Sequence, residues 1–311
     1  MTTAMASKAA ADVALINSEL VNRWIAFAQV IPASEKSYRK GVRRLSEYCA
    51  ENKIREFSRK MFVDYREFLI QKYSGSTVNL YLTAAKLFCT FLQVEGLLDN
   101  NPTEHLKGVK ISPEHKKDAL SAADTKKILA SFDTSTLKGK RDKAMYSLMT
   151  TAGLRTVEIV RANVGDIYSF GGKVFLRVQG KGHVEKDAQI RITDGVYKMI
   201  LDYLNECGEV KDSTPLFASV ARRNFGERMT TTSISRIIKT ALKVAGYNSR
   251  RLTAHSLRHT AATAALLAGA TIREVQQTLR HTNITVTQIY LHELDRLNNR
   301  AECLAAAAFG I

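Results

Sequence analysis

Basic side chains and one tyrosine gather near the end of the 311-residue chain. His255 and Arg258 are three residues apart, so a helix would place them on one face, one turn apart. His281 follows, and Tyr290 trails it by nine residues. A cationic clamp beside a hydroxyl nucleophile suggests phosphoryl transfer rather than simple binding. The rest of the chain is therefore expected to supply a second arginine, a proton donor and a way to hold a long polyanion.

The composition favours nucleic acid as that polyanion. The formal net charge is +16 and the pI is about 9.7, a basic balance that favours nucleic acid before membrane. The four cysteines are scattered without a CxxC pair, so we expect reduced cysteines in a cytoplasmic protein rather than a zinc site or a disulfide framework. No run of about 18 apolar residues and no signal-peptide pattern occurs, so no membrane partner is expected.

The length allows two domains, and the first is expected to be a helical bundle. Residues 1–15 are small and weakly patterned, which predicts a flexible tail. From Ile16 onward, apolar residues recur at three- and four-residue steps. This period predicts a compact bundle of four or more helices over residues 16–105.

Two groups of side chains in the bundle are candidates for binding DNA. One group lines the second predicted helix and could follow a phosphate backbone, although such charges equally often only face solvent. Its members are Arg39, Lys40, Arg43 and Arg44. The other group clusters at a helix start, where N–H groups and hydroxyls suit a phosphate. Its members are Lys72, Ser76, Thr77 and Asn79.

Residues 106–118 are polar, carry several lysines and contain Pro113. This composition predicts a basic linker between two domains. A basic linker that joins two basic domains is a plausible hinge around a duplex.

Residues 119–311 predict a mostly helical domain with a small antiparallel sheet. Strand-like alternation at residues 174–178 and 189–192 flanks a Gly-Lys-Gly turn that carries Lys181. Upstream, Gly153 permits a sharp turn from which Arg155 can project. Glu158 could orient that guanidinium, although an Arg/Glu pair at this spacing is more often an ordinary surface pair. The expected fold class is therefore mainly α, with a helical bundle followed by a mixed, mostly helical domain.

These pieces, in this order, resemble the tyrosine recombinases, the phage integrase family. The matching blocks are Thr-Ala-Gly-Leu-Arg at 151–155 with Glu158, Gly-Lys-Gly at 180–182, His-Ser-Leu-Arg-His-Thr at 255–260, Leu-Arg-His at 279–281, and Tyr290. The resemblance is strong across about residues 113–292, and the N-terminal bundle looks like the family's core-binding domain. Arg280 is a departure, because the family usually has glycine before this histidine.

The resemblance implies a role for each residue of the set. Tyr290 would attack the scissile phosphate and form a covalent 3′-phosphotyrosine, and His255 would accept its proton or orient the group that does. Arg155 and Arg258 would clamp the non-bridging oxygens.

His281 would add a third hydrogen bond to the phosphate, and Lys181 would protonate the departing 5′ oxygen as general acid. The diester energy stays in the tyrosyl bond, so no ATP, metal or other cofactor is expected.

Taken singly, these residues also have ordinary explanations. Tyr290 stands between Ile289 and Leu291, a setting typical of the core. His255 and His259 have the spacing of zinc ligands, but Ser256 stands where a zincin has glutamate. The joint occurrence of all six catalytic residue types favours the catalytic interpretation.

Beyond the tyrosine, an apolar pattern predicts a C-terminal helix from about residue 293. It could pack on its own domain or, as in related recombinases, on a neighbouring subunit. The sequence thus predicts a site-specific DNA recombinase that acts as a homotetramer on double-stranded DNA with inverted-repeat core sites. A type IB topoisomerase-like nicking-closing enzyme and a catalytically silent DNA-binding relative are the alternatives.

Overall fold

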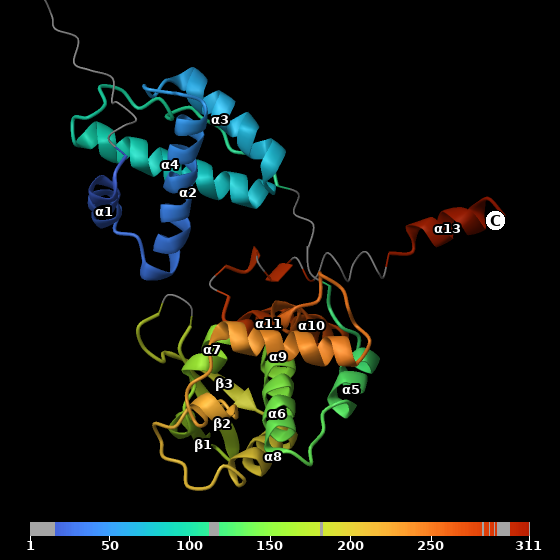
Figure 1. Ribbon diagram of the computed structural model, residues 1–311. Helices are drawn as coiled ribbons and strands as arrows, with labels where there is room; N and C mark the ends of the chain where they lie inside the picture. Colours follow the sequence, from blue (N-terminus) through green and yellow to red (C-terminus); the bar gives the residue numbers. More distant parts are fainter. Residues whose placement is uncertain are drawn as a thin grey trace, which may run out of the picture. The chain divides into compact units, whose positions relative to one another are not determined.

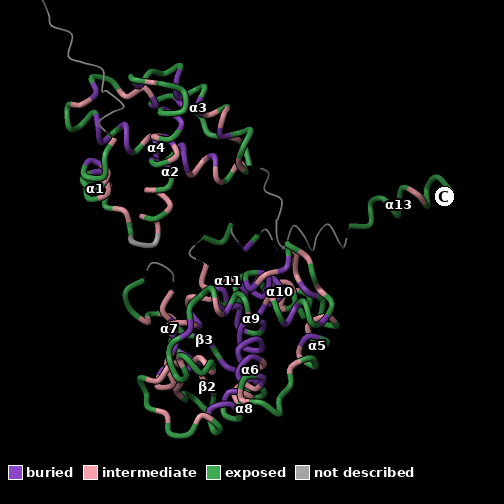
Figure 2. Tube along the Cα trace, viewed as in Figure 1, coloured by how far each residue is buried: buried purple, intermediate pink, exposed green. Residues whose placement is uncertain are grey.

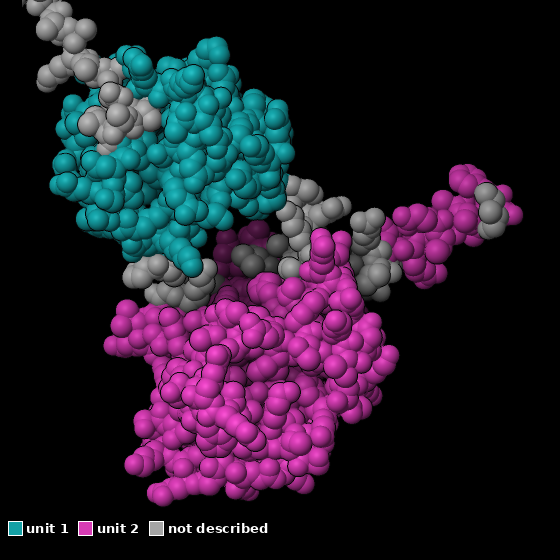
Figure 3. Space-filling view, in the orientation of Figure 1, with its two compact units in different colours: residues 1–113 teal, residues 114–311 magenta. Residues whose placement is uncertain are grey.

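The computed structural model describes residues 16–111, 118–180, 183–281, 283–285, 287–288, 290 and 299–310, without the side chains of Pro32 and Ala33. The predicted tail, residues 112–117 of the predicted linker, Lys181 and the start of the predicted C-terminal helix lie outside these residues. The chain divides into two compact units, Met1–Pro113 and Glu114–Ile311 (Figure 3). Each unit encloses a hydrophobic core of its own.

Unit 1 is a bundle of helices (Figure 1). Its helices are α1 (Ser18–Phe27), α2 (Pro32–Glu51), α3 (Arg59–Lys72) and α4 (Gly75–Val94). Asn17 and Ser58 accept backbone N–H groups in the first turns of α1 and α3, which fixes where these helices begin. A Cβ at Gly41 would lie 2.7 Å from the Cβ of Ala84, so glycine permits α2 and α4 to pack this closely.

The core of unit 1 is rich in aromatic side chains. Trp24, the only tryptophan of the chain, is fully buried and meets Phe88 edge-on at 5.5 Å between ring centroids. Tyr48 packs at 5.0 Å from Tyr65 in the same core. The buried positions recur at helical steps, as the sequence predicts.

Unit 2 is mostly helical with one small sheet. Its helices are α5 (Ala122–Ala130), α6 (Leu137–Ala152), α7 (Thr156–Arg161), α8 (Asp194–Leu204), α9 (Thr231–Val244), α10 (Ala254–Leu267), α11 (Ile272–Leu279) and α13 (Ala301–Ala308). The strands are β1 (Ile167–Phe170), β2 (Lys173–Val178) and β3 (Ala188–Ile192), antiparallel in the order β1-β2-β3. Leu176 of β2 pairs with Ile167 and Ile190, and it is fully buried. The expected fold class is confirmed.

Helix α6 is the centre of unit 2 and is buried along most of its length (Figure 2). It packs against α8 and α10, and its buried residues run almost without interruption from Arg141 to Ala152. The helix ends at Gly153, whose left-handed backbone has a φ of 58°. A Cβ at Gly153 would lie 2.4 Å from Leu279 Cδ2, so glycine lets the end of α6 meet the end of α11.

The C-terminal residues 301–308 form α13, which has no buried residue. Leu304 and Phe309 leave 60% and 77% of their surface exposed. None of the helices in the described ranges is long and apolar enough to span a bilayer.

Candidate active site

Arg155 stands at a corner between two helices, two residues after Gly153. It is the N-cap of α7, and Glu158 caps it, because the backbone N–H of Arg155 donates to Glu158 Oε2 at 2.7 Å. Arg155 Nη1 donates to Glu158 Oε1 at 3.1 Å. Glu158 is fully buried while 28% of the Arg155 side chain remains exposed, so this is not an ordinary surface pair. The carboxylate holds the guanidinium at the edge of the protein interior.

Arg258 lies in the second turn of α10 and is only 2% exposed. Its Nη1 donates to the carbonyl of Gly153 at 2.6 Å, and its Nη2 donates to the carbonyl of Leu279. One side chain therefore ties the end of α6 to the end of α11. Burial, followed by the nearby Arg155 and Arg280, lowers the pKa of Arg258 to about 9. The guanidinium remains charged at neutral pH.

Arg280 is the residue at which the sequence departs from the family pattern. It ends α11 in the left-handed conformation, with φ 56° and ψ 46°. Its Nη2 donates to Glu158 Oε2 at 2.8 Å, so one buried carboxylate serves two arginines. Burial lowers the pKa of Arg280. The backbone at this position thus keeps the geometry that suits glycine.

His281 follows directly and is half-buried. Its Nδ1 lies 2.9 Å from Thr287 Oγ1, and its backbone amide donates to the carbonyl of Gln276 at 3.1 Å. Burial, followed by Arg258 and Arg155, lowers the pKa of His281 to about 4. The imidazole is therefore neutral at pH 7. A tautomer whose Nδ1 accepts the Thr287 hydroxyl leaves Nε2–H as a donor.

Tyr290 lies at one end of a row of three rings. The His255 and His259 rings meet edge-on at 5.1 Å, and the His259 and Tyr290 rings meet edge-on at 5.3 Å. Tyr290 is 4% exposed and packs in a small cluster with Val275 and Leu279. His259 has no role in the sequence-based set, although its position four residues after His255 placed both on one helical face.

The structure brings five of the six predicted catalytic residues into one neighbourhood. Arg155 and Tyr290 both act electrostatically on Arg258, and His255 acts on His281. Lys181, the sixth, lies outside the described residues. Gly180, which precedes it, accepts a 2.8 Å hydrogen bond from Arg161 of α7. The start of this turn is thus fastened to the helix that holds Arg155. Among the described residues, no cluster of metal-ligating side chains occurs.

The three arginines of the first group of predicted DNA contacts form ion pairs with glutamates of unit 1. Arg39 Nε donates to Glu35 at 2.7 Å, and Arg43 lies 3.5 Å from Glu47. Arg44 pairs with Glu47 and stacks over the ring of Phe68 at 4.7 Å. A role of these arginines in DNA binding, with that of Lys40, remains a prediction.

The second group shows a more pronounced structural role. Ser76 and Thr77 lie in the first turn of α4, and Lys72 Nζ lies 4.3 Å from the ring centroid of Phe68. The Asn79 amide accepts from Val109 N at 2.8 Å and donates to Val109 O at 3.0 Å. Asn79 therefore fastens the segment after the bundle to α4, a contact that the sequence reasoning missed.

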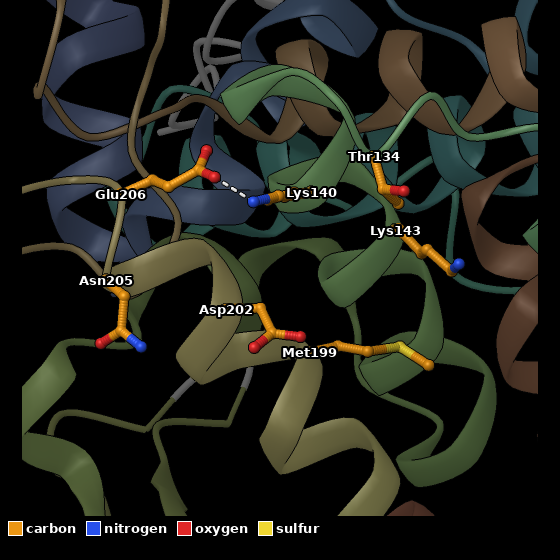
Figure 4. Close-up of a pocket in the computed structure, with 7 residues that line it drawn as sticks. All are labelled: Thr134, Lys140, Lys143, Met199, Asp202, Asn205 and Glu206. Carbon is orange, nitrogen blue, oxygen red and sulfur yellow. Dashed lines mark hydrogen bonds and ion pairs between the residues drawn. The ribbon is translucent and has the colours of Figure 1, made fainter.

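Two surface pockets of unit 2 lie away from the active-site residues. One, of about 470 Å³, lies between α6 and α8, where Lys140 pairs with Glu206 (Figure 4). Its mixed charges make it a poor phosphate site. The other, of about 540 Å³, combines hydroxyl groups with basic side chains. Its basic members are Lys138, Arg141, Arg223, Arg228 and Arg236.

The basic pocket suits a polyanion, yet the sequence analysis did not assign it. Arg141 and Arg228 are committed to the protein, since they donate to the carbonyls of Ala218 and Val160. The pocket residues are spread over residues 138–237, so no short motif marks them in the sequence.

Guanidiniums and a neutral imidazole beside a tyrosine are groups that can hold a phosphate and attack it. Comparison of sequences shows the family of the chain. The model of the phage integrase family matches residues 118–296. The chain belongs to this family, the tyrosine recombinases, and it is a DNA strand-transferring enzyme, a site-specific recombinase.

Relatives cover most of the chain. Tyrosine recombinase XerD of Listeria innocua is 31% identical over 221 residues, which span 70% of this chain and 72% of XerD. Tyrosine recombinase XerC of Chlamydia trachomatis is 31% identical over 220 residues, spanning 71% of this chain and 68% of XerC. The resemblance stated from the motifs is confirmed, and the topoisomerase-like and catalytically silent alternatives are not favoured.

Solved structures share the fold. XerH bound to a palindromic difH substrate matches with a TM-score of 0.71 and 18% identity, over 90% of this chain and 83% of XerH. A lambda integrase dimer bound to a COC′ core site matches with a TM-score of 0.67 and 15% identity, over 86% of this chain and 96% of the integrase.

Proposed function

We propose that this recombinase cleaves double-stranded DNA through Tyr290, with Arg155, Arg258 and His281 holding the scissile phosphate. The observation that carries the proposal is the gathering of these groups, from four separate segments, around the ends of α6 and α11. Buried cations that repel one another are stabilised by an anion, and a phosphodiester supplies one. The neutral His281 can donate to a phosphate oxygen without adding to the repulsion.

The remaining roles follow the same chemistry. A tyrosine of pKa about 10 costs about 4 kcal/mol to ionise at pH 7, so the nearby guanidiniums must favour the phenolate. His255 accepts the proton of Tyr290 or orients the group that does. Lys181 donates a proton to the 5′ oxygen as the bond from phosphorus to that oxygen breaks. The bond from phosphorus to Tyr290 forms as it breaks, so the number of phosphoester bonds is unchanged.

The test is covalent capture. Wild-type protein and Tyr290→Phe are incubated with fragmented DNA of the source organism, and SDS-resistant complexes are isolated and sequenced. Wild-type protein should yield adducts enriched in one sequence, and Tyr290→Phe should bind that sequence without forming an adduct. Tyr168→Phe, which removes a hydroxyl from the sheet of unit 2, is the control and should still form adducts. Adducts with Tyr290→Phe would refute the assignment of the nucleophile.

We further propose that the captured site consists of inverted-repeat core sequences in cytoplasmic DNA, occupied by four copies of the chain. The exposed apolar residues Leu304 and Phe309 of the C-terminal segment support docking on a neighbouring copy. A tetramer on a Holliday junction is known for lambda integrase. Replacing both residues with serine should leave binding to a single half-site unchanged and abolish the larger complex on a full site. A full-sized complex with this variant would contradict the proposal.

A further inference from the structure

The backbone of Arg280 is in a conformation that an arginine adopts at a cost. Among the described residues, only Gln29, Lys53 and Arg280 combine a side chain with a positive φ. The left-handed region costs a residue with a Cβ about 1 kcal/mol, and glycine avoids that cost. Something in the fold must offset the strain at Arg280.

The side chain supplies the compensating contacts. Arg280 Nη2 lies 2.8 Å from Glu158 Oε2, and Nε lies 3.4 Å from Glu158 Oε1. Its Nη1 donates to the carbonyl of Thr278 at 2.6 Å. Only 11% of the side chain is exposed, and Glu158 is not exposed at all. The fork of the guanidinium thus faces both oxygens of a carboxylate 122 residues away.

The same two oxygens hold Arg155. Oε1 accepts from Arg155 Nη1, and Oε2 accepts from the Arg155 backbone N–H. Each oxygen of Glu158 therefore faces donors from both arginines. Without Arg280, the carboxylate would be fixed from one side only, and Arg155 could rotate together with it.

We propose that Arg280 is a positioning residue, which locks the Glu158 carboxylate so that Arg155 is held ready for the scissile phosphate. The inference rests on the proposed function. It also accounts for the charges, because one carboxylate shared by two guanidiniums leaves a net positive charge, whereas a single Arg155–Glu158 pair would be neutral. A shared carboxylate fixes Arg155 and leaves positive charge to stabilise the negative charge that develops on the phosphate in the transition state, so the effect falls on the rate.

Three substitutions separate the backbone of Arg280 from its side chain. Arg280→Gly and Arg280→Asn both tolerate the left-handed conformation, but neither reaches Glu158. Arg280→Lys keeps the charge and can make a single contact with the carboxylate. Each variant is compared with wild-type protein on the duplex recovered by covalent capture, with the cleavage rate constant and the DNA Kd measured separately.

We expect Arg280→Gly and Arg280→Asn to cleave about tenfold more slowly, less than the 10²–10³ typical of removing a direct donor. Their DNA Kd should stay within about twofold of wild type, and Arg280→Lys should recover part of the rate. In a Glu158→Gln background, Arg280→Gly should cause little further loss, because both residues act through one contact. A role in folding alone would not lower the cleavage rate while leaving the DNA Kd unchanged.

The outcomes identify which idea fails. No adduct with wild-type protein would sink the proposed function itself. If wild-type protein forms adducts and Arg280→Gly cleaves at the wild-type rate, only the positioning role is refuted. The positioning role is also refuted if the rate losses of Arg280→Gly and Glu158→Gln multiply in the double variant. A loss above about 10² with Arg280→Gly would overturn it in favour of direct contact with phosphate.

Discussion

Replacing Glu158 with glutamine removes one charge and almost no volume from the centre of the candidate active site. The carboxylate is fully buried and lies 3.1 Å from Arg155 Nη1 and 2.8 Å from Arg280 Nη2. A hydrogen bond to a charged group contributes about 1.5–3 kcal/mol, against about 0.5–1.5 for a neutral one. Weakening two such contacts costs about 2–3 kcal/mol, and complete loss of a partner from a buried pair costs about 3–5. We expect Glu158→Gln to lower the free energy of unfolding of unit 2 by about 2–4 kcal/mol.

The chain provides an internal reference for this measurement. Trp24 is the only tryptophan and lies in the core of unit 1, so its fluorescence in urea follows unit 1. Far-UV circular dichroism follows the helices of both units. Glu158→Gln should shift the dichroism transition of unit 2 to lower urea and leave the fluorescence transition unchanged.

The control variant is Glu209→Gln, which changes the same charge at an exposed position in unit 2. It should stay within about 0.5 kcal/mol of wild type. Sulfate should recover more stability in Glu158→Gln than in the control, because an anion can replace the missing charge. A loss below about 1 kcal/mol would refute the claim that Glu158 holds the two guanidiniums together.

Four further predictions concern separate parts of the chain. Lys181→Ala should cleave slowly on normal DNA and regain activity on a 5′-bridging phosphorothiolate, whose sulfur leaves without a proton; absence of rescue would argue against a general acid. The pKa of His281, about 4, lies below its unfolded value of about 6.5, so this residue should contribute stability that is lost as the pH falls from about 6.5 towards 4. A resonance assigned to the His281 imidazole that titrates near 6.5 in NMR would contradict this. Asn79→Ala should destabilise unit 1 by about 1–2 kcal/mol in the fluorescence transition, since two hydrogen bonds to Val109 are lost; an unchanged transition would refute the structural role. DNA affinity should fall steeply with salt as counterions are released, and a flat profile would remove the electrostatic basis of binding.

Much of the fold follows from local patterns in the sequence. The apolar period marks the helices of unit 1, and the alternation at residues 174–178 and 189–192 marks two of the three strands. The corner at Gly153 is also foreseeable, because glycine before a charged residue at a helix end is a local signal. Some contacts have a local signal as well: Glu35 stands four residues before Arg39, a spacing that predicts their ion pair.

Other contacts have no local signal at all. Arg44 lies over Phe68 of another helix, and Asn79 holds Val109 from 30 residues away. Side chains of this kind resemble solvent-facing polar residues in the sequence, because nothing nearby reveals their partner. Predictions of DNA contacts from charge alone therefore mix ligands of phosphate with side chains that hold the protein together.

Arg280 shows how a departure from a family pattern can be judged from physical chemistry. A residue with a Cβ is disfavoured in the left-handed conformation, so the backbone alone would select glycine. The arginine is compatible with the fold because Glu158 is within reach, buried and already bound to Arg155. Burial, followed by repulsion from Arg155 and Arg280, lowers the pKa of Arg258 in this cluster. That repulsion costs stability in the free protein. On the proposed function, an incoming phosphate relieves it, so the charges that weaken the fold would also favour binding of DNA.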